Sequence, residues 1–276
     1  MESAKSKAAV IYVNDKIYAI GGITNTLEPS DEIEMFDTNI NKWVSLTKMP
    51  GGARQGMTAA SVDGKIYVIG GKKGSQNLKL VEEYNPSTNT WVKKADMPTA
   101  RQGAVCATVG GKIYVIGGYN STKHFKTVEE YDPATDKWST GKAAMLTARD
   151  TAGVAVIDNK IYVIGGFNSS DKYLNNMEAY DPAQDIWETK TPMNTARRAL
   201  GICQVNGLIY AIGGLNTEGD LSKVEVYNPA TNEWQEKSEM RMKRSYLSVV
   251  TVNSSIYAIG GTFNGEPINT VEEFIP

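Results

Sequence analysis

The length, composition and charge of the chain set the first limits on its fold and function. It has 276 residues, of which 41% are hydrophobic and 22% charged, and a formal net charge of −2. A chain of this length buries a sizeable core, as one large domain or two ordinary ones. The near balance of acidic and basic residues gives no overall attraction to nucleic acid or anionic membranes, so we expect a soluble, globular protein that binds neither.

Histidine, cysteine and apolar segments exclude further classes. The single histidine, His124, removes most metal sites and histidine-dependent catalytic schemes, and two cysteines make no disulfide framework. We therefore expect no metal and no cofactor. Residues 1–16 carry charges throughout, and no apolar run is long enough to span a membrane. The compartment is undetermined, with the cytoplasm as the default expectation.

A repeat runs along the whole chain. Glycine pairs recur every 47 to 49 residues, at Gly21-Gly22, Gly70-Gly71, Gly117-Gly118, Gly165-Gly166, Gly213-Gly214 and Gly260-Gly261. An Ile-Tyr pair precedes each glycine pair, and an aromatic residue follows about a dozen residues later. A tryptophan completes five of the six units, at Trp43, Trp91, Trp138, Trp187 and Trp234. A period near fifty residues with paired glycines and periodic aromatics indicates a propeller.

Each unit predicts four strands and no helix. In the third unit, residues 103–109 are small and suit an innermost strand, and Gly110-Gly111 turns the chain into the apolar strand 112–116. A loop leads to a third strand at 128–131, and a turn leads to a fourth strand that carries Trp138. The bulk of this tryptophan fits the widening gap between the outer edges of neighbouring blades.

This pattern of paired glycines, tyrosine and tryptophan resembles the kelch repeat, and the resemblance covers essentially the whole chain. It implies an all-β, six-bladed propeller with a central channel, as a single domain over 1–276. The six repeats are expected at 1–48, 49–96, 97–144, 145–192, 193–239 and 240–276. Kelch domains include ubiquitin-ligase adaptors, actin-binding proteins, a sialic-acid epimerase and a copper oxidase. The copper oxidase needs a histidine pair, which this chain lacks.

A cation stands at one aligned position in all six units, just before the innermost strand. These residues are Lys5, Arg54, Arg101, Arg149, Arg197 and Arg244. We expect them to lie at the channel mouth with the loops that follow the glycine pairs. Exposed groups expected on those loops are Tyr119, Asn120, Phe167, Asn168, Leu215, Asn216, Phe263 and Asn264. Ubiquitin-ligase kelch adaptors are similar here, and the resemblance implies that the five arginines contact an acidic peptide; Lys5 lacks the bidentate fork.

The opposite interpretation of this cation ring is structural. Every unit places a glutamate in its third strand, at Glu34, Glu82, Glu129, Glu178, Glu225 and Glu272, and a buried carboxylate needs a charged or donor partner. The cations and glutamates are therefore expected either to bind ligand or to pair with one another. Asp150 and Arg198 break the repeat symmetry, which makes them the sharper site candidates. His124 is expected to be a solvated loop residue, and Cys106 and Cys203 to be small buried thiols.

Three functions are consistent with these residues. The first is a non-catalytic binding module for a protein, an acidic peptide or an anionic ligand, which uses the loop and arginine face. The second is a sugar-acid epimerase or mutarotase resembling the kelch sialic-acid epimerase. The third is a structural unit of a larger protein. Because no isolated acid or base stands clear of the repeat pattern, a catalytic role is the less favoured interpretation.

The sixth unit is shorter than the others. The sequence reaches Pro276 just after its third strand, so the sixth blade is expected to lack the outermost, tryptophan-bearing strand. Blades one and six are still expected to close the ring through their inner strands. The edge at 271–275 would then be unpaired, and an unpaired edge invites pairing with another chain. We expect either a fragment of a longer parent or self-association through this edge.

Overall fold

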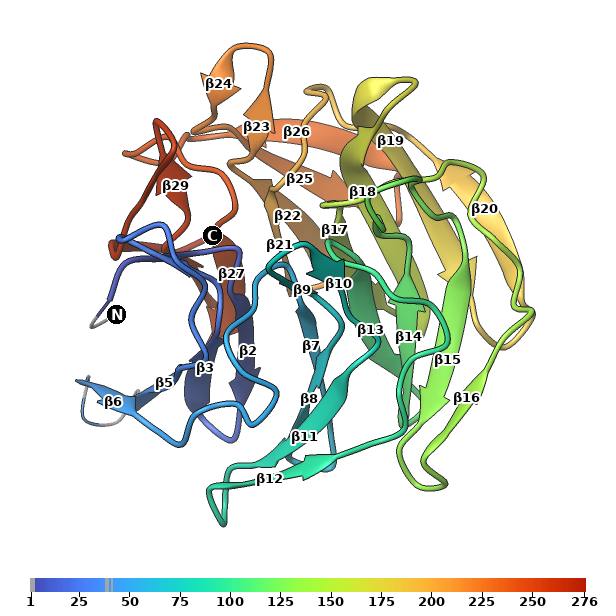
Figure 1. The fold of residues 1–276 in the computed structure, drawn as a ribbon. Helices are drawn as coiled ribbons and strands as arrows, with labels where there is room; N and C mark the ends of the chain where they lie inside the picture. Colours follow the sequence, from blue (N-terminus) through green and yellow to red (C-terminus); the bar gives the residue numbers. More distant parts are fainter. Residues whose placement is uncertain (1–2, 38–39, 41) are drawn as a thin grey trace.

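The computed structural model describes residues 3–37, 40 and 42–276. Six antiparallel sheets surround a central axis, and the first and last sheets lie side by side (Figure 1). The kelch-type six-bladed propeller is therefore confirmed. Five blades have four strands each, from the inside outward: β2 (Ala9–Val13), β3 (Lys16–Ile20), β5 (Ile33–Asp37), β6 (Lys42–Ser45); β7 (Thr58–Val62), β8 (Lys65–Ile69), β11 (Val81–Asn85), β12 (Thr90–Lys93); β13 (Val105–Val109), β14 (Lys112–Ile116), β15 (Val128–Asp132), β16 (Lys137–Ser139); β17 (Gly153–Ile157), β18 (Lys160–Asn168), β19 (Lys172–Asp181), β20 (Ile186–Lys190); β21 (Gly201–Val205), β22 (Leu208–Ile212), β25 (Val224–Asn228), β26 (Glu233–Lys237).

The sixth blade has three strands among the described residues, as expected from the sequence. Four short hairpins occupy the loops of the first, second, fifth and sixth blades. The sixth blade contains β27 (Ser248–Val252), β28 (Ser255–Ile259) and β31 (Val271–Phe274). The hairpins are β1 (Lys5–Ser6) with β4 (Ile23–Thr24), β9 (Lys72–Lys73) with β10 (Gln76–Asn77), β23 (Leu215–Asn216) with β24 (Gly219–Asp220), and β29 (Thr262–Phe263) with β30 (Glu266–Pro267).

The turn glycines adopt the backbone that the sequence demands. Gly110 and Gly111 have φ of 58° and 73°, and a two-residue hairpin turn needs positive φ at both places. Gly118 is also left-handed, with φ of 94°, and a Cβ there would lie 2.9 Å from the carbonyl oxygen of Gln102. The second glycine of each pair thus lets two backbone segments approach closely.

The tryptophans tie each blade to the one before it. Trp138 packs on Tyr131, with ring centroids 5.0 Å apart, and its indole N–H donates to the carbonyl of Ala95 in the second blade at 2.9 Å. The Tyr131 hydroxyl donates to Asp136, which accepts the backbone N–H of Ala95 at 2.9 Å. The expected role of the tryptophan at the outer blade edges is confirmed.

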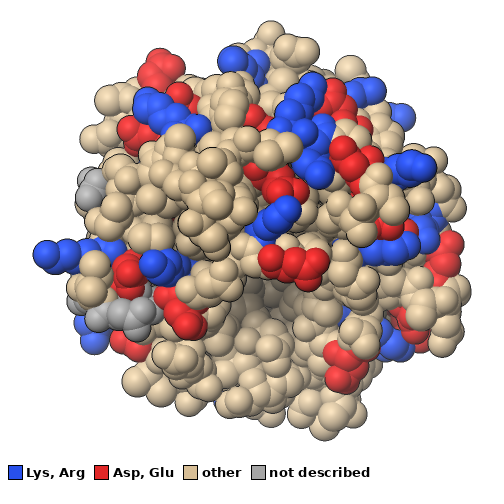
Figure 2. Space-filling view, turned by 90° about the horizontal axis from the view of Figure 1, so that it is seen from below, with Lys and Arg blue, Asp and Glu red and all other residues tan. Residues whose placement is uncertain are grey.

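The surface carries both charge signs. On the face drawn in Figure 2, basic and acidic side chains both lie around a central hollow, and neither sign covers the face. No helix of the described chain has the length and apolar character needed to cross a bilayer.

Candidate functional site

The ring of aligned cations points into the blades and not into the channel. Each cation pairs with the third-strand glutamate of its own blade, and all six cationic side chains are 0–1% exposed. The nitrogen–oxygen distances are 2.7 Å for Arg54 and Glu82, 2.6 Å for Arg101 and Glu129, and 3.1 Å for Arg197 and Glu225. Arg244 pairs with Glu272, and Lys5 lies 3.6 Å from Glu34.

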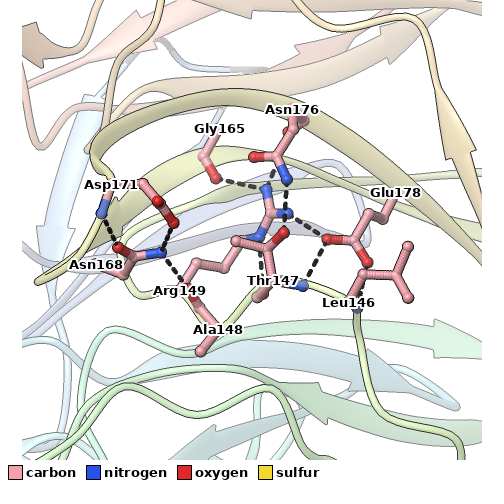
Figure 3. Close-up of polar contacts among 9 residues, drawn as sticks. All are labelled: Leu146, Thr147, Ala148, Arg149, Gly165, Asn168, Asp171, Asn176 and Glu178. Carbon is pink, nitrogen blue, oxygen red and sulfur yellow. Dashed lines mark hydrogen bonds and ion pairs between the residues drawn. The ribbon is translucent and has the colours of Figure 1, made fainter.

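Arg149 shows how one such arginine joins two blades (Figure 3). Its guanidinium pairs with Glu178 at 2.5 Å and donates to the carbonyls of Gly165 and Asn176 at 2.8 and 2.9 Å. Its own carbonyl accepts the N–H of Gly118, in the third blade, at 2.8 Å. Burial lowers the pKa of the Arg149 guanidinium, and the Glu178 carboxylate opposes that effect.

These contacts change the assignment of the arginines. The structure brings Arg54, Arg101, Arg149, Arg197 and Arg244 to buried ion pairs, which is the structural alternative left open by the sequence. A ligand at the channel mouth does not meet their guanidinium groups, because residues along an extended segment alternate in direction and the next residue faces the mouth instead. We therefore correct the expectation for these five arginines and remove them from the candidate site.

A closed ring of backbone hydrogen bonds forms the channel mouth. Two positions after each ring cation, the residue is left-handed, with φ between 46° and 64°. The N–H of each of these residues donates to the carbonyl of the equivalent residue in the preceding blade, at 2.8 to 3.4 Å. Members of the ring are Lys7, Gly56, Gly103, Thr151, Ala199 and Tyr246. Blades one and six therefore close through their inner ends, as expected.

This ring surrounds a cavity of about 360 Å³. Six polar side chains line it, namely Lys7, Gln55, Gln102, Asp150, Arg198 and Tyr246. The two symmetry-breaking residues picked from the sequence, Asp150 and Arg198, are thus brought together there. Lys7, Gln55, Gln102 and Tyr246 were missed, although Lys7 and Tyr246 stand where two other units have glycine, which is the same kind of signal.

Arg198 is held by aromatic rings and leaves one donor free. Its guanidinium carbon lies 4.7 Å from the ring centre of Phe167 and 5.7 Å from that of Tyr173. Its Nε is buried and has no hydrogen-bond partner among the described residues. A buried donor without a partner costs about 1–3 kcal/mol. Phe167, a candidate from the sequence, therefore positions Arg198.

The remaining charges of the cavity are partly buried. Burial lowers the pKa of Lys7, and the charges of Arg198 and Lys72 lower it further. The Lys7 ammonium lies 4.8 Å from the ring centre of Tyr246, a cation–π distance. Burial raises the pKa of Asp150, and the bond from Thr151 and the charges of His124 and Arg198 oppose that effect. The cavity therefore has two basic groups and one acid.

His124 is not the solvated loop residue expected from the sequence. Its side chain is 9% exposed, with Nε2 3.8 Å from a carboxylate oxygen of Asp150. Its ring lies 4.7 Å from that of Tyr119 and 5.9 Å from that of Phe167. The loops of the third and fourth blades thus enclose it, which the sequence could not show because the two loops are far apart along the chain.

The other loop candidates divide by position. Tyr119 lines the cavity, whereas the amide oxygen of Asn120 accepts backbone N–H groups of its own loop. Asn168 is buried and binds Ala148 and Asp171 (Figure 3), and Asn216 accepts the N–H of Glu218. Phe263 is 39% exposed and lines neither the central cavity nor the cavity beside it. None of the last four faces the central cavity.

Cys106 and Cys203 are buried free thiols, as expected, and burial raises the pKa of each to about 12. Such thiols are poor nucleophiles and poor metal ligands at neutral pH. Within the described ranges, histidine, cysteine and acidic residues form no cluster of three that is able to hold a metal ion.

Comparisons with known proteins agree with this fold. The solved structure titled "Structure of YjhT" superposes with a TM-score of 0.85 at 23% identity and covers 97% of this chain and 94% of its own. Kelch-like protein 7 of Rattus norvegicus is 35% identical over 94 residues, which are 33% of this chain and 15% of that protein. N-acetylneuraminate epimerase of Escherichia coli O157:H7 is 40% identical over 85 residues, which are 29% of this chain and 22% of that protein.

The match to these two curated relatives thus spans less than a quarter of either. A family profile covers far more of the chain, over residues 17–272. The chain belongs to the Attractin/LZTR1 beta-propeller family.

Proposed function

We propose that the protein is a binding module whose central cavity holds an anionic group, the side-chain carboxylate of an acidic segment in a partner protein. The observation that carries this proposal is the buried Nε of Arg198, which faces no acceptor among the described residues. Lys7 adds a second positive charge to the same cavity. A carboxylate between these two groups gives the arginine its acceptor and opposes the mutual repulsion of the two cations.

The shape of the mouth supports an extended ligand. A second cavity of about 570 Å³ adjoins the first, and Lys7, Gln55 and Tyr246 line both. Its walls include the apolar side chains of Ile23, Leu27 and Leu215. An acidic side chain bound at Arg198 therefore leaves room for flanking peptide to lie across the first, fifth and sixth blades.

A peptide array tests this function. Decapeptides that contain Asp or Glu are compared with matched peptides that contain Asn or Gln, and bound hits are measured in solution. We expect the acidic members alone to bind, and Arg198→Ala to weaken them at least tenfold, since a charge-assisted bond to a buried site is worth about 1.5–3 kcal/mol. Arg241→Ala, an exposed arginine outside both cavities, is the control. Equal binding of acidic and amide peptides contradicts the proposal.

One observation favours a second function, a mutarotase for sugar acids. Mutarotation needs one group that takes a proton from the anomeric hydroxyl and another that gives a proton to the ring oxygen. Asp150 lines the cavity beside Arg198, and His124 lies 3.8 Å from its carboxylate. The name of the Escherichia coli relative makes N-acetylneuraminate the substrate to test.

Proton NMR of freshly dissolved N-acetylneuraminate measures this activity. A mutarotase accelerates the approach to the anomer equilibrium, and Asp150→Asn removes the acceleration while the fold is kept. A rate equal to that of buffer alone contradicts the second function and leaves the binding module as the proposal.

A further inference from the structure

The outer part of the sixth blade differs from that of the other five. Val271, in β31, is 42% exposed, whereas the aligned residues Val81, Val128 and Val224 are 0–4% exposed. The carboxylate side chain of Glu272 is 22% exposed, against 1% for Glu178. The other blades bury these positions beneath a fourth strand, and no fourth strand covers β31 in the described part of the chain.

A groove of about 230 Å³ lies where that strand would pack against the fifth blade. Ile212 and Val224 of the fifth blade and Ile256, Ala258 and Phe274 of the sixth form its apolar wall. Met240 is only partly buried here, although the aligned methionines of the other blades are 1–2% exposed. The groove is thus an apolar site of the size that a large side chain fills.

Equivalent grooves show what such a site binds. In three other blades an Asp or Asn, one intervening residue and a Trp clamp one residue of the preceding blade. The indole donates to that residue's carbonyl at 2.8–2.9 Å, and the Asp or Asn accepts its N–H at 2.9–3.1 Å. The clamped residues are Ala95, Ala143 and Thr191.

Ser238 occupies the clamped position in the fifth blade, two residues before Met240, and it lines the groove. It is exposed, whereas Ala95, Ala143 and Thr191 are half-buried. No hydrogen bond joins its backbone N–H or carbonyl to another described residue. The donor and the acceptor that the motif uses elsewhere are therefore both free here.

Charge adds a further requirement. Glu83 and Glu130, aligned with Glu273, each pair with a lysine that lies three or four residues after the tryptophan of the same blade, Lys94 at 3.5 Å and Lys142 at 2.8 Å. Glu273 accepts the Tyr257 hydroxyl, and no cation pairs with it among the described residues. The groove therefore favours an occupant with a basic residue after its tryptophan.

We propose that β31 and this groove bind an extended peptide segment with an Asp or Asn, any residue, a Trp, two further residues and a Lys. The segment adds antiparallel to β31, its indole fills the groove, and its Asp or Asn binds Ser238. This strand addition combines main-chain pairing with one large side-chain pocket. The site lies at the outer edge of the sixth blade and shares no lining residue with the central cavity.

Fluorescence anisotropy with a labelled peptide tests the site. The probe is the segment 87–95 of this chain, Ser-Thr-Asn-Thr-Trp-Val-Lys-Lys-Ala, which forms the equivalent strand of the second blade. We expect saturable binding to the whole protein, weakened at least tenfold in the peptide with Trp91→Ala, because a buried aromatic side chain contributes about 1.5–3 kcal/mol. Asn89→Ala weakens binding severalfold, since it loses the bond to Ser238.

Charge reversal provides the matched control. The peptide with Lys94→Glu binds the wild-type protein more weakly, and the protein variant Glu273→Lys restores its binding while it weakens the original peptide. Glu273 is exposed, so this variant keeps the fold. Equal affinities of the Trp91→Ala and original peptides overturn the proposal, as does the absence of saturable binding. A dimer that Glu273→Lys dissociates, and with which the peptide does not compete, assigns the edge to self-association instead.

Discussion

The backbone N–H of Lys7 donates to the carbonyl of Tyr246 at 3.4 Å, and the Lys7 ammonium lies 4.8 Å from the ring centre of Tyr246. This bond closes the ring of six backbone hydrogen bonds at the junction between the first and last blades. It is the longest of the six, and both residues line the central cavity. The site and the closure of the propeller therefore depend on the same pair of residues.

Neighbouring arginines separate structural from binding roles. Arg197 is fully buried against Glu225, and Arg197→Ala leaves that carboxylate buried without its partner. We expect a loss of about 3–5 kcal/mol in the free energy of unfolding, measured by urea denaturation. Arg198→Ala removes a half-buried side chain without an ion pair, so its loss stays below about 1 kcal/mol. Equal destabilisation by the two variants contradicts this division.

Binding of an acidic peptide to the cavity is expected to strengthen as the pH falls from 7 toward 5. Burial raises the pKa of Asp150, so this carboxylate takes up a proton at a higher pH than an ordinary aspartate. Protonation removes the negative charge beside Arg198 while most of the peptide carboxylate is still ionised. Titration calorimetry measures the effect. Asp150→Asn binds more tightly at pH 7 and loses the pH dependence; a variant that retains it contradicts the role of Asp150.

Acid stability depends on the aspartates between the blades. The bonds from the Tyr180 hydroxyl and the Ala143 N–H lower the pKa of Asp185. At Asp136 burial acts to raise the pKa, but the corresponding bonds from Tyr131 and Ala95 prevail and lower it. A lowered folded-state pKa stabilises the fold at pH values above the unfolded-state pKa of about 3.9, and this stabilisation is lost as the pH falls further.

The double variant Asp136→Asn, Asp185→Asn should therefore lose less stability between pH 5 and pH 3 than the wild type. Asn232 shows that asparagine keeps the geometry, since it accepts the Tyr227 hydroxyl at 2.7 Å and the Thr191 N–H at 3.1 Å. Urea denaturation at each pH gives the unfolding free energies. Parallel curves for the two proteins show that these carboxylates do not contribute.

A fourth strand supplied in cis should stabilise the sixth blade. Pro276 aligns with Pro229, so the sequence of residues 230–237, which includes Trp234, is appended after Pro276. Burial of one aromatic side chain contributes about 1.5–3 kcal/mol, which corresponds to several degrees in Tm for a domain of this size. The same extension with Trp replaced by Ala is the control. An unchanged Tm, or an equal rise in the control, shows that the groove does not take the indole.

The sequence predicted the fold and only part of the site. Glycine pairs, Ile-Tyr pairs and tryptophans each report a local backbone or packing requirement, so the third blade has its strands within two residues of expectation. The first strand begins at Val105 and not at residue 103, because Gly103 belongs to the left-handed ring. Repeats also explain why the cations and glutamates pair in every blade.

The cavity residues were harder to predict because they meet across blades. Asp150 and Arg198 stood out as breaks in the repeat, but His124 reaches Asp150 from a loop of the preceding blade. Tyr246 and Lys7 come from opposite ends of the chain. Spacing within one repeat contains no information on such contacts, which depend on how the six blades close.

The central claim, that Arg198 binds the anion while the ring arginines hold the blades together, is tested most directly by NMR of the arginine Nε–Hε groups. An acidic peptide selected on the array is titrated into the ¹⁵N-labelled protein, and resonances are assigned by single Arg→Lys variants. We predict that the Arg198 signal shifts with saturation while those of Arg54, Arg101, Arg149, Arg197 and Arg244 stay in place. Movement of the ring arginines with a stationary Arg198 signal would contradict the account.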